Sequence, residues 1–292
     1  MKNYIIYILV RLIISILQAI SLEKATQFGD FLAWLCGDVL KIRRRLVEDN
    51  LRHAFPECSE AEIRGMERGM WRHLFRMLVE TAFAERKIHL TNWKQYVTLR
   101  NEVPPLRCIY ERRPVIFATG HLGNFEFAGY VLGLIGIPAY TVARTLDNPY
   151  LDHYLGTYRR STGQAIIPKN HASSMLQQAM EFGKTLAILT DQHAGKKGVR
   201  SRSFGRTVYT HKVISILAQT YDAPVCIASS IRQRGEPFHF VIEVAEFLEV
   251  RVNPEHAGTR EMAQWYNDNM ERLIRQVPDQ YWWLHNRWRD DK

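Results

Sequence analysis

Apolar residues change their spacing along this chain near residue 95. From residue 23 to residue 94 they recur every three or four positions, as in ATQFGDFLAWLCGDVL and MWRHLFRMLVETAF, which is the spacing of helices with one buried face. Beyond residue 95, short apolar runs alternate with helical stretches. Such alternation is typical of an α/β fold, in which buried strands form a sheet and helices cover its faces. We therefore expect a central, mostly parallel sheet flanked by helices.

The apolar runs also predict the individual elements. We expect buried strands at 115–119, 139–143, 185–190 and 224–231. A more alternating strand at 238–247 suits the edge of the sheet. Helices are expected at 125–135, 149–161, 171–182, 211–221 and 258–276.

The chain shows no internal repeat and no low-complexity linker. We therefore expect an N-terminal membrane-anchoring helix, 1–22, followed by a single domain, 23–292. Within that domain the patterns predict a helical layer (23–95), an α/β core (96–250) and a C-terminal helix with a tail (251–292). A chain of 292 residues is within the size range of one elaborated α/β domain.

The N-terminal segment, residues 4–22, reads YIIYILVRLIISILQAISL and carries one charge, at Arg11. At a rise of about 1.5 Å per residue, a helix of this length just crosses a hydrocarbon core. Arg11, Ser15 and Gln18 fall on one side of such a helix, so the segment also suits a helix that lies in the membrane interface. Both arrangements stay open. A cleaved signal peptide is less favoured, because Arg11 interrupts the apolar run.

The charge balance favours an anionic partner. Lys and Arg number 39 against 30 Asp and Glu, a formal charge of +9 at pH 7. Such an excess suits nucleic acid, an anionic bilayer or an acidic protein. Lys41, Arg43, Arg44 and Arg45 follow soon after the apolar segment, where basic residues bind anionic headgroups on the cytoplasmic side of a membrane. We expect an anionic membrane surface as partner, although an isolated charge run is more often a solvated helix face.

The stretch VIFATGHLGNFEFAGYVLGLIG carries the candidate chemistry. A strand ends at Gly120 and a helix begins near Asn124, so a turn lies between them. On one regular helix the side chains of His121 and Glu126 would point about 140° apart, but such a turn can bring them together. A carboxylate beside an imidazole makes the ring a better base for a hydroxyl that attacks a thioester. Gly123 and Asn124 permit the tight turn and could offer free N–H groups to an oxyanion. The HxxxxE spacing alone also fits a histidine at the core edge beside a helix-capping acid.

Four further segments follow the GHLGNFE turn: ARTLDNPYLDHYLGTYRRSTG, TDQHAG, SFGRT and PDQYWWLHNRWR. In this order the five segments resemble the late acyltransferases of lipid A biosynthesis, the lauroyl and myristoyl transferases of the lysophospholipid acyltransferase superfamily. The likeness runs from the N-terminal segment to the tail. It implies a glycerolipid-acyltransferase-like fold in which His121 and Glu126, the ends of the HX4E motif, form the catalytic pair.

The resemblance also implies a reaction. It is the transfer of a fatty acyl chain from acyl carrier protein or acyl coenzyme A to a hydroxyl of a lipid A precursor, without metal or cofactor, at the cytoplasmic face of the bacterial inner membrane. Another glycolipid or a lysophospholipid as acceptor would use the same chemistry. A non-catalytic basic membrane-binding protein fits the charge as well. Nucleic acid is not expected as a partner, because the HLGNFE turn is intact.

Residues beyond the turn complete the expected site. The resemblance places Arg144 and Asn148 at its rim, where an arginine could bind phosphate through two parallel hydrogen bonds. Asp191 and Gln192 follow a strand at the sheet edge where α/β proteins place their sites, and would orient Arg144 or the acceptor. A salt bridge for Arg144 and a turn cap for Asp191 are the plainer alternatives.

A basic stretch and an aromatic stretch follow the expected site residues. Lys196, Lys197 and Arg200 could meet the phosphates of the acceptor or an acidic acyl carrier protein, although solvated loop charges are commoner. Trp282 and Trp283 in the tail could lie at a membrane interface or pack against the core.

Several other classes of site are excluded by spacing. The GKT at 183–185 lacks the earlier glycine of a P-loop, and the chain contains neither the GxSxG of serine hydrolases nor the HExxH of zincins. The four cysteines are scattered without a CxxC pair, so neither a zinc site nor a disulfide framework is expected.

Overall fold

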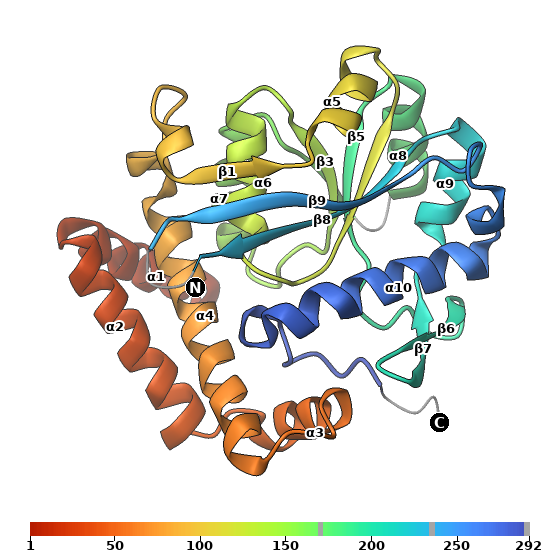
Figure 1. The fold of residues 1–292 in the computed structure, drawn as a ribbon. Helices are drawn as coiled ribbons and strands as arrows, with labels where there is room; N and C mark the ends of the chain where they lie inside the picture. The colour runs from red at the N-terminus through yellow and green to blue at the C-terminus, as the bar shows by residue number, and fades with distance from the viewer. Residues whose placement is uncertain (169–171, 234–236, 289–292) are drawn as a thin grey trace.

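A seven-stranded sheet forms the centre of the protein in a computed structural model that describes residues 1–168, 172–233 and 237–288 (Figure 1). Its strands are β1 (Val97–Arg100), β2 (Val115–Thr119), β3 (Ala139–Ala143), β4 (Ala165–Pro168), β5 (Thr185–Leu189), β8 (Val225–Arg232) and β9 (Phe240–Leu248). They lie in the order β1-β9-β8-β2-β5-β3-β4. Among the described residues, β8 and β9 form the one antiparallel pair of this sheet, so the expected mostly parallel α/β fold is confirmed.

The structure differs from the expected strands in three places. The strand expected at the sheet edge, β9, lies inside it, because β1 pairs with its outer side. The strands β1 and β4 were not predicted, since VTLR and AIIP are too short to show a period. The basic stretch after residue 196 is part of a hairpin of β6 (Val199–Ser203) and β7 (Arg206–Thr210), not a loop alone.

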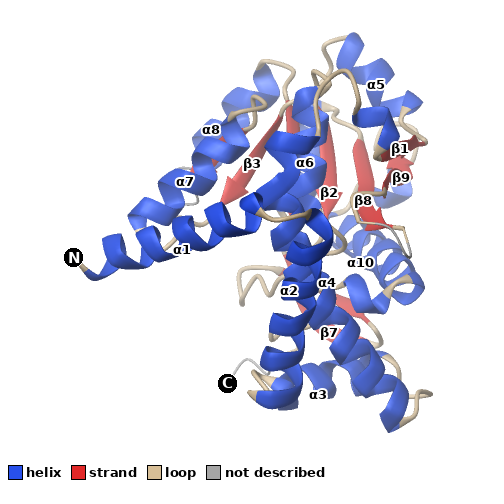
Figure 2. Ribbon diagram, turned by 90° about the vertical axis from the view of Figure 1, so that its left-hand side faces the viewer, coloured by secondary structure: helices blue, strands red, loops and turns tan. Residues whose placement is uncertain are grey.

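Helices cover both faces of the sheet (Figure 2). One face carries α5 (Val103–Tyr110), α6 (Phe125–Leu134) and α7 (Pro149–Arg160), and the other carries α8 (Ala172–Glu181), α9 (Val213–Tyr221) and α10 (Thr259–Gln276). Right-handed crossovers explain this division: the chain moves across the sheet in one direction from β1 to β4 and returns in the other from β4 to β8. The expected helix from 171 begins at Ala172, and residue 171 itself lies outside the described residues.

An N-terminal helical layer packs beside the sheet. It consists of α1 (Lys2–Ala19), α2 (Leu22–Trp34), a π-helical turn (Leu35–Val39), α3 (Arg44–Ala54) and α4 (Glu60–Lys87). Ser59 and Glu62 form a capping box that starts α4, and this long helix packs against α2, α3 and α6. One apolar cluster joins Leu51 of α3 and Met70 of α4 to Ile116 of β2. The layer therefore shares its core with the sheet.

The first helix, α1, lies on the surface along its whole length and is long and apolar enough to cross a membrane. Its polar stripe faces the protein: the guanidinium of Arg11 lies 4.5 Å from the ring centroid of Tyr154, and Gln18 donates a hydrogen bond to the carbonyl oxygen of Ala82. Outward-facing residues include Ile5, Leu9, Leu12 and Ile16. The helix thus turns its apolar side away from the domain.

The C-terminal tail packs against the back of the turn at residues 121–124. Leu122 forms a β-bridge with Tyr281, and the N–H of Trp282 donates to the carbonyl oxygen of His121 at 3.0 Å. Tyr281 and Trp283 are buried in the core. The aromatic tail therefore belongs to the folded core, the second of its two expected roles.

Candidate active site

The carboxyl ends of the parallel strands bring two site residues together. β2 and β5 are neighbours in register, with Thr119 opposite Leu189. Both strands end at this pair, and His121 and Asp191 each follow two residues later. Because parallel neighbours end at the same edge of a sheet, the two side chains meet there.

Asp191 binds His121 through both carboxylate oxygens. The ring Nδ1 of His121 lies 2.8 Å from Oδ1, and the backbone N–H of His121 donates to Oδ2 at 2.7 Å. A carboxylate accepts hydrogen bonds, so Nδ1 carries the proton and Nε2 is left as the basic nitrogen. The rings of Phe125 and Trp282 flank the imidazole, with centroids 5.1 and 5.8 Å away. The role expected for Asp191 from the sequence was a different one, to orient Arg144 or the acceptor.

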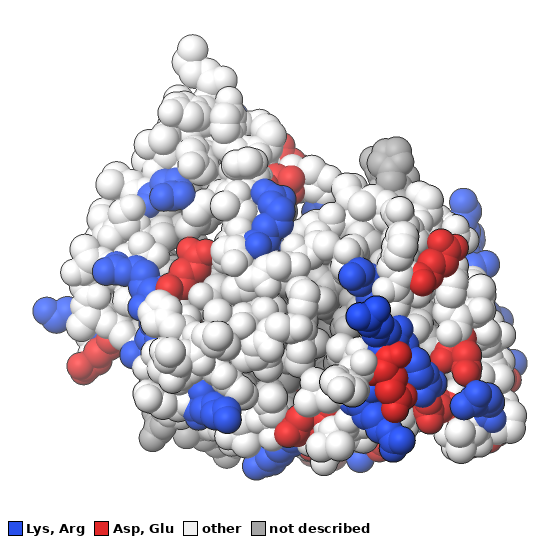
Figure 3. Space-filling view, turned by 90° about the horizontal axis from the view of Figure 1, so that it is seen from above, with Lys and Arg blue, Asp and Glu red and all other residues white. Residues whose placement is uncertain are grey.

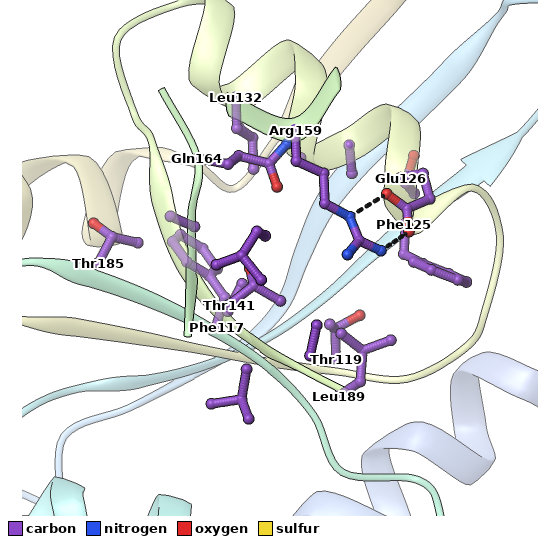
Figure 4. Close-up of a pocket in the computed structure, with 18 of the residues that line it drawn as sticks. Phe117, Thr119, Phe125, Glu126, Leu132, Thr141, Arg159, Gln164, Thr185 and Leu189 are labelled. Carbon is purple, nitrogen blue, oxygen red and sulfur yellow. Dashed lines mark hydrogen bonds and ion pairs between the residues drawn. The ribbon is translucent and has the colours of Figure 1, made fainter. Parts of the chain in front are cut away.

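Glu126 pairs with Arg159, not with the imidazole. Arg159 of α7 donates from Nε to Oε2 at 3.0 Å and from Nη2 to Oε1, so the two side chains form a bidentate ion pair between α6 and α7 (Figure 4). The expectation that Glu126 holds His121 therefore differs from the structure, in which Asp191 does so. Arg159 was missed, because the sequence YRRS does not tell which arginine of α7 points inward.

The charges around His121 favour its protonated form. Burial alone lowers the pKa of the ring, but the charge of Asp191, its hydrogen bond and the charge of Glu126 outweigh burial and raise the pKa above 6.5. For Asp191, burial raises the pKa, and the charge and hydrogen bonds of His121, together with the charge of Arg287, outweigh this and lower it. Asp191 is therefore ionised at neutral pH and His121 is a stronger base than a free histidine.

The turn after β2 has its backbone groups already engaged. Gly123 has φ +64°, and a Cβ there would lie 1.9 Å from the carbonyl oxygen of Ser230, so only glycine fits. The N–H of Gly123 donates to the carbonyl oxygen of Gln280 and the N–H of Asn124 to that of Ser230, both at 2.9 Å. These two N–H groups are not free, contrary to the expectation that they could hold an oxyanion. Asn124 instead caps α6, because its Oδ1 accepts from the N–H of Phe127 at 3.0 Å.

A long apolar cavity of about 640 Å³ lies between the sheet and helices α5, α6 and α7. His121 and Leu189 line it at the carboxyl ends of the strands, and Ala139 and Thr185 line it at the amino ends. A five-residue strand spans about 16 Å. Figure 4 shows Phe117, Thr141 and Leu189 along the strands and Leu132, Gln164 and the Glu126–Arg159 pair above them. The cavity thus suits a long hydrocarbon chain that reaches from the imidazole to the far end of the strands.

The remaining expected site residues lie in different surroundings. Arg144 lines the cavity rim, with its side chain 79% exposed and paired to Asp147 at 3.1 Å. Gln192 also lines the cavity, and its amide nitrogen lies 3.4 Å from Nε2 of His121. Asn148 is a helix cap: its Oδ1 accepts from the N–H of Tyr150 at 3.1 Å, and its Nδ2 donates to the carbonyl oxygen of Asn3 at 2.8 Å. Asn148 thus connects α7 to α1, and within the described residues it is not among those that line the cavity.

The basic side chains of Lys196, Lys197 and Arg200 are exposed around the start of the β6–β7 hairpin. Within the described part of the chain, none of the three lines the cavity. Their expected contact with the acceptor stays a prediction.

Metal-ligating side chains are scattered. Across residues 1–168, 172–233 and 237–288, no three or more His, Cys, Asp or Glu side chains are grouped to hold a metal ion. The four cysteines are free thiols, of which Cys108 and Cys226 are buried.

Comparison with known proteins points to one family. The family model of bacterial lipid A biosynthesis acyltransferases matches residues 1–290. The lipid A biosynthesis palmitoleoyltransferase of Escherichia coli (strain K12) is 25% identical over 260 residues, covering 86% of this chain and 80% of that protein. The lipid A biosynthesis lauroyltransferase of the same organism is 24% identical over 263 residues, with the same coverage. A lipid A biosynthesis acyltransferase of Shigella flexneri is 25% identical over 260 residues, again covering 86% and 80%.

Proposed function

The chain belongs to the bacterial lipid A biosynthesis acyltransferase family, and on this premise we propose that it transfers a fatty acyl chain from an acyl carrier protein or coenzyme A thioester to a hydroxyl of a lipid A precursor. One observation carries the proposal. A histidine that is held by a buried carboxylate stands at the end of an apolar cavity long enough for an acyl chain.

The proposed reaction is a direct transfer. Nε2 of His121 removes the proton from the acceptor hydroxyl, whose oxygen attacks the thioester carbonyl carbon. The tetrahedral intermediate collapses, the C–S bond breaks, and the thiolate takes the proton back from Nε2. Asp191 holds the ring in the required tautomer and stabilises the imidazolium between these two steps.

Negative charge on the carbonyl oxygen needs a partner other than Gly123 and Asn124. The N–H groups of Phe125 and Glu126 begin α6, and the first N–H groups of a helix have no carbonyl acceptor within the helix. Arg159 adds a positive charge on the same wall of the cavity. We propose that the start of α6 and Arg159 together stabilise the oxyanion, and that Glu126 fixes the position of Arg159.

The apolar cavity is the proposed site of the acyl chain, so its depth should limit the chain length. Ala187 faces the cavity at the level of Thr141, two residues, or about 7 Å, nearer to the carboxyl ends than Ala139. A larger side chain at either position would fill space that the end of the acyl chain needs.

Ala187→Leu is therefore expected to shift the preferred donor toward a chain at least two carbons shorter. Each methylene that loses its place in the cavity costs about 0.8 kcal/mol, roughly a fourfold loss in kcat/KM. Ala139→Leu, at the far end, is the matched control and should cause a smaller shift. Rates with a series of acyl thioesters measure both, and an unchanged preference in both variants would contradict this use of the cavity.

The acceptor is proposed to approach along the rim that carries Arg144. Arg144 is highly exposed, and its pairing with the even more exposed Asp147 is easily exchanged for a phosphate. Another glycolipid acceptor would fit the same rim. A nucleic-acid role lacks support on the face that Figure 3 shows, where basic side chains lie among acidic ones and form no single basic patch.

We propose that the protein lies on the cytoplasmic face of the bacterial inner membrane through α1 and α2. The outward side of α1 is apolar, and α2 adds an exposed aromatic row, Phe28, Phe31 and Trp34, with ring centroids 6.4 and 5.8 Å apart. Figure 2 shows that both helices lie across the same side of the molecule. Lys41 and Arg45, exposed just beyond α2, suit anionic headgroups. An in-plane α1 also lets Arg11 keep Tyr154 as its partner.

The double variant Phe31→Ser, Trp34→Ser is expected to weaken binding to vesicles that contain anionic phospholipid by at least about 100-fold, because each of the two aromatic rings contributes about 1.5 to 3 kcal/mol when buried. Phe182→Ser is the control, since Phe182 is also an exposed aromatic residue but follows α8 on the other face of the sheet. Co-sedimentation with vesicles measures binding. Equal binding by the double variant and the wild type would exclude α2 from the membrane contact.

The proposed function is tested by mass spectrometry of lipid A from cells with and without the gene. We expect the mass of one acyl chain to disappear without the gene and to return when the gene is supplied on a plasmid. If lipid A is unchanged while another glycolipid loses an acyl chain, the acceptor is that glycolipid. If no lipid changes, the proposed transfer is wrong.

A further inference from the structure

A buried cluster of three polar side chains lies behind the turn that carries His121. Arg232, at the end of β8, donates from Nε and Nη2 to the two carboxylate oxygens of Glu80 on α4, both at 2.6 Å. Its Nη1 lies 2.8 Å from Nδ1 of His73, which lies about two turns before Glu80 on the same face of α4. The exposed fractions are 8% for Arg232, 2% for Glu80 and 4% for His73. In the described residues none of the three lines the cavity, so the cluster is not a part of the substrate site.

The cluster binds two adjacent residues of the turn from α4. Nε2 of His73 lies 3.2 Å from the carbonyl oxygen of Gly123, and Glu80 accepts a hydrogen bond from Nδ2 of Asn124 at 3.0 Å. Gln280 of the tail exchanges two hydrogen bonds with the backbone of Arg232, at 3.0 and 2.9 Å. The carbonyl oxygen of Gln280 in turn accepts from the N–H of Gly123.

The protonation of His73 follows from its neighbours. Burial, and then the charge of Arg232, lower the pKa of His73 to about 3, so the ring is neutral at physiological pH. Arg232 has only donors, so Nδ1 of His73 must accept and Nε2 must carry the proton. His73 therefore donates a hydrogen bond from Nε2 to the carbonyl oxygen of Gly123.

Stability alone is a weak reason for this arrangement. A buried ion pair contributes little or nothing to folding relative to apolar side chains of the same volume, because both charges lose their hydration. The cluster instead fixes geometry: His73 and Glu80, both held by Arg232, bind two adjacent residues of one turn. The position of that turn determines whether the imidazole of His121 meets Asp191.

We propose that His73, Glu80 and Arg232 position the catalytic turn, with His73 as the positioning residue that holds the carbonyl group of Gly123. This rests on the proposed function in so far as His121 is the base. The three residues act through the turn and do not touch the acyl chain or the acceptor.

His73→Leu tests the proposal because it removes the hydrogen bond to Gly123 and leaves the Glu80–Arg232 pair intact. We expect kcat to fall about tenfold, equivalent to about 1.4 kcal/mol, with KM nearly unchanged. The pKa of His121 should fall as its contact with Asp191 loosens, as measured by NMR titration of the ring. His73→Gln can donate to the carbonyl oxygen and accept from Arg232, so both values should return close to those of the wild type.

Tyr130→Phe is the control for a merely structural loss. It removes another buried hydrogen bond near α6, from Tyr130 to the carbonyl oxygen of Ile88 at 3.2 Å, and should lower Tm without changing kcat or the pKa of His121. The proposal is overturned if His73→Leu lowers Tm alone, or if His73→Gln behaves like His73→Leu. Because the NMR titration needs no substrate, it decides the positioning role even if the lipid A experiment fails.

Discussion

His121→Ala is expected to abolish acyl transfer while the protein stays folded. The imidazole is the proposed base for the acceptor hydroxyl, and general base catalysis contributes about 10² to 10⁴ in rate, with protonation of the leaving thiolate lost as well. The ring stands at the wall of the cavity, so its removal enlarges a space that is already open and leaves no sealed void in the core. Steady-state transfer from a labelled acyl thioester measures the loss, and the melting temperature checks the fold.

His256→Ala is the matched control for this variant. His256 lies in a short 3₁₀ turn after β9, packed near Trp265, and is remote from the residues that line the cavity. It should keep the rate of the wild type. Full transfer by His121→Ala would remove the histidine from the mechanism, and the proposed chemistry with it.

Asp191→Asn is expected to lower kcat by about 10³ to 10⁴ with little change in the cavity. An amide at this position can donate to Nδ1, which forces the proton of the neutral ring onto Nε2, where a lone pair is needed; the same substitution in a serine protease triad has an effect of about 10⁴. The carboxylate is also the main charge that raises the pKa of His121. Both effects remove the base without removing the ring.

The pH dependence gives an independent check on Asp191. The base must be neutral to accept a proton, so kcat/KM falls as the pH drops through the pKa of His121. Because that pKa is raised, the fall in kcat/KM of the wild type at acidic pH should have its midpoint above pH 6.5. In Asp191→Asn the residual activity should fall at a lower pH than in the wild type, since burial then lowers the pKa of the ring without the opposing charge of Asp191.

Glu126→Gln separates the two acids. Loss of the Glu126 carboxylate leaves Arg159 without its bidentate partner but keeps the His121–Asp191 contact. We therefore expect kcat to fall by about 10- to 100-fold, less than for Asp191→Asn. Asp268→Asn, on the exposed side of α10, controls for the loss of a carboxylate elsewhere. If Glu126→Gln abolishes transfer and Asp191→Asn does not, Glu126 is the partner of His121 during the reaction.

The order of elements was determined by the sequence. Apolar periodicity is a local property, so the alternating strands and helices, the helical layer and the apolar α1 could be predicted from their own residues. The turn after β2 is also a local feature. It needs only a strand end, Gly123 with φ +64°, and a helix that is capped by Asn124, and all of these lie within a few residues. The strands β1 and β4 escaped prediction because four residues are too few to show a period.

The partners of the site residues were decided only by the tertiary structure. Asp191 reaches His121 because β2 and β5, 70 positions apart at the site, are neighbours in register, and Glu126 meets Arg159 because α6 and α7 cover the same face. The N–H of Gly123 is occupied by the carbonyl oxygen of Gln280 in the tail, more than 150 residues away, and the N–H of Asn124 by that of Ser230 on β8. The spacing of residues along a chain constrains only contacts between near neighbours. Contacts between distant residues depend on strand order and helix packing, and these bring Asp191, not Glu126, to His121.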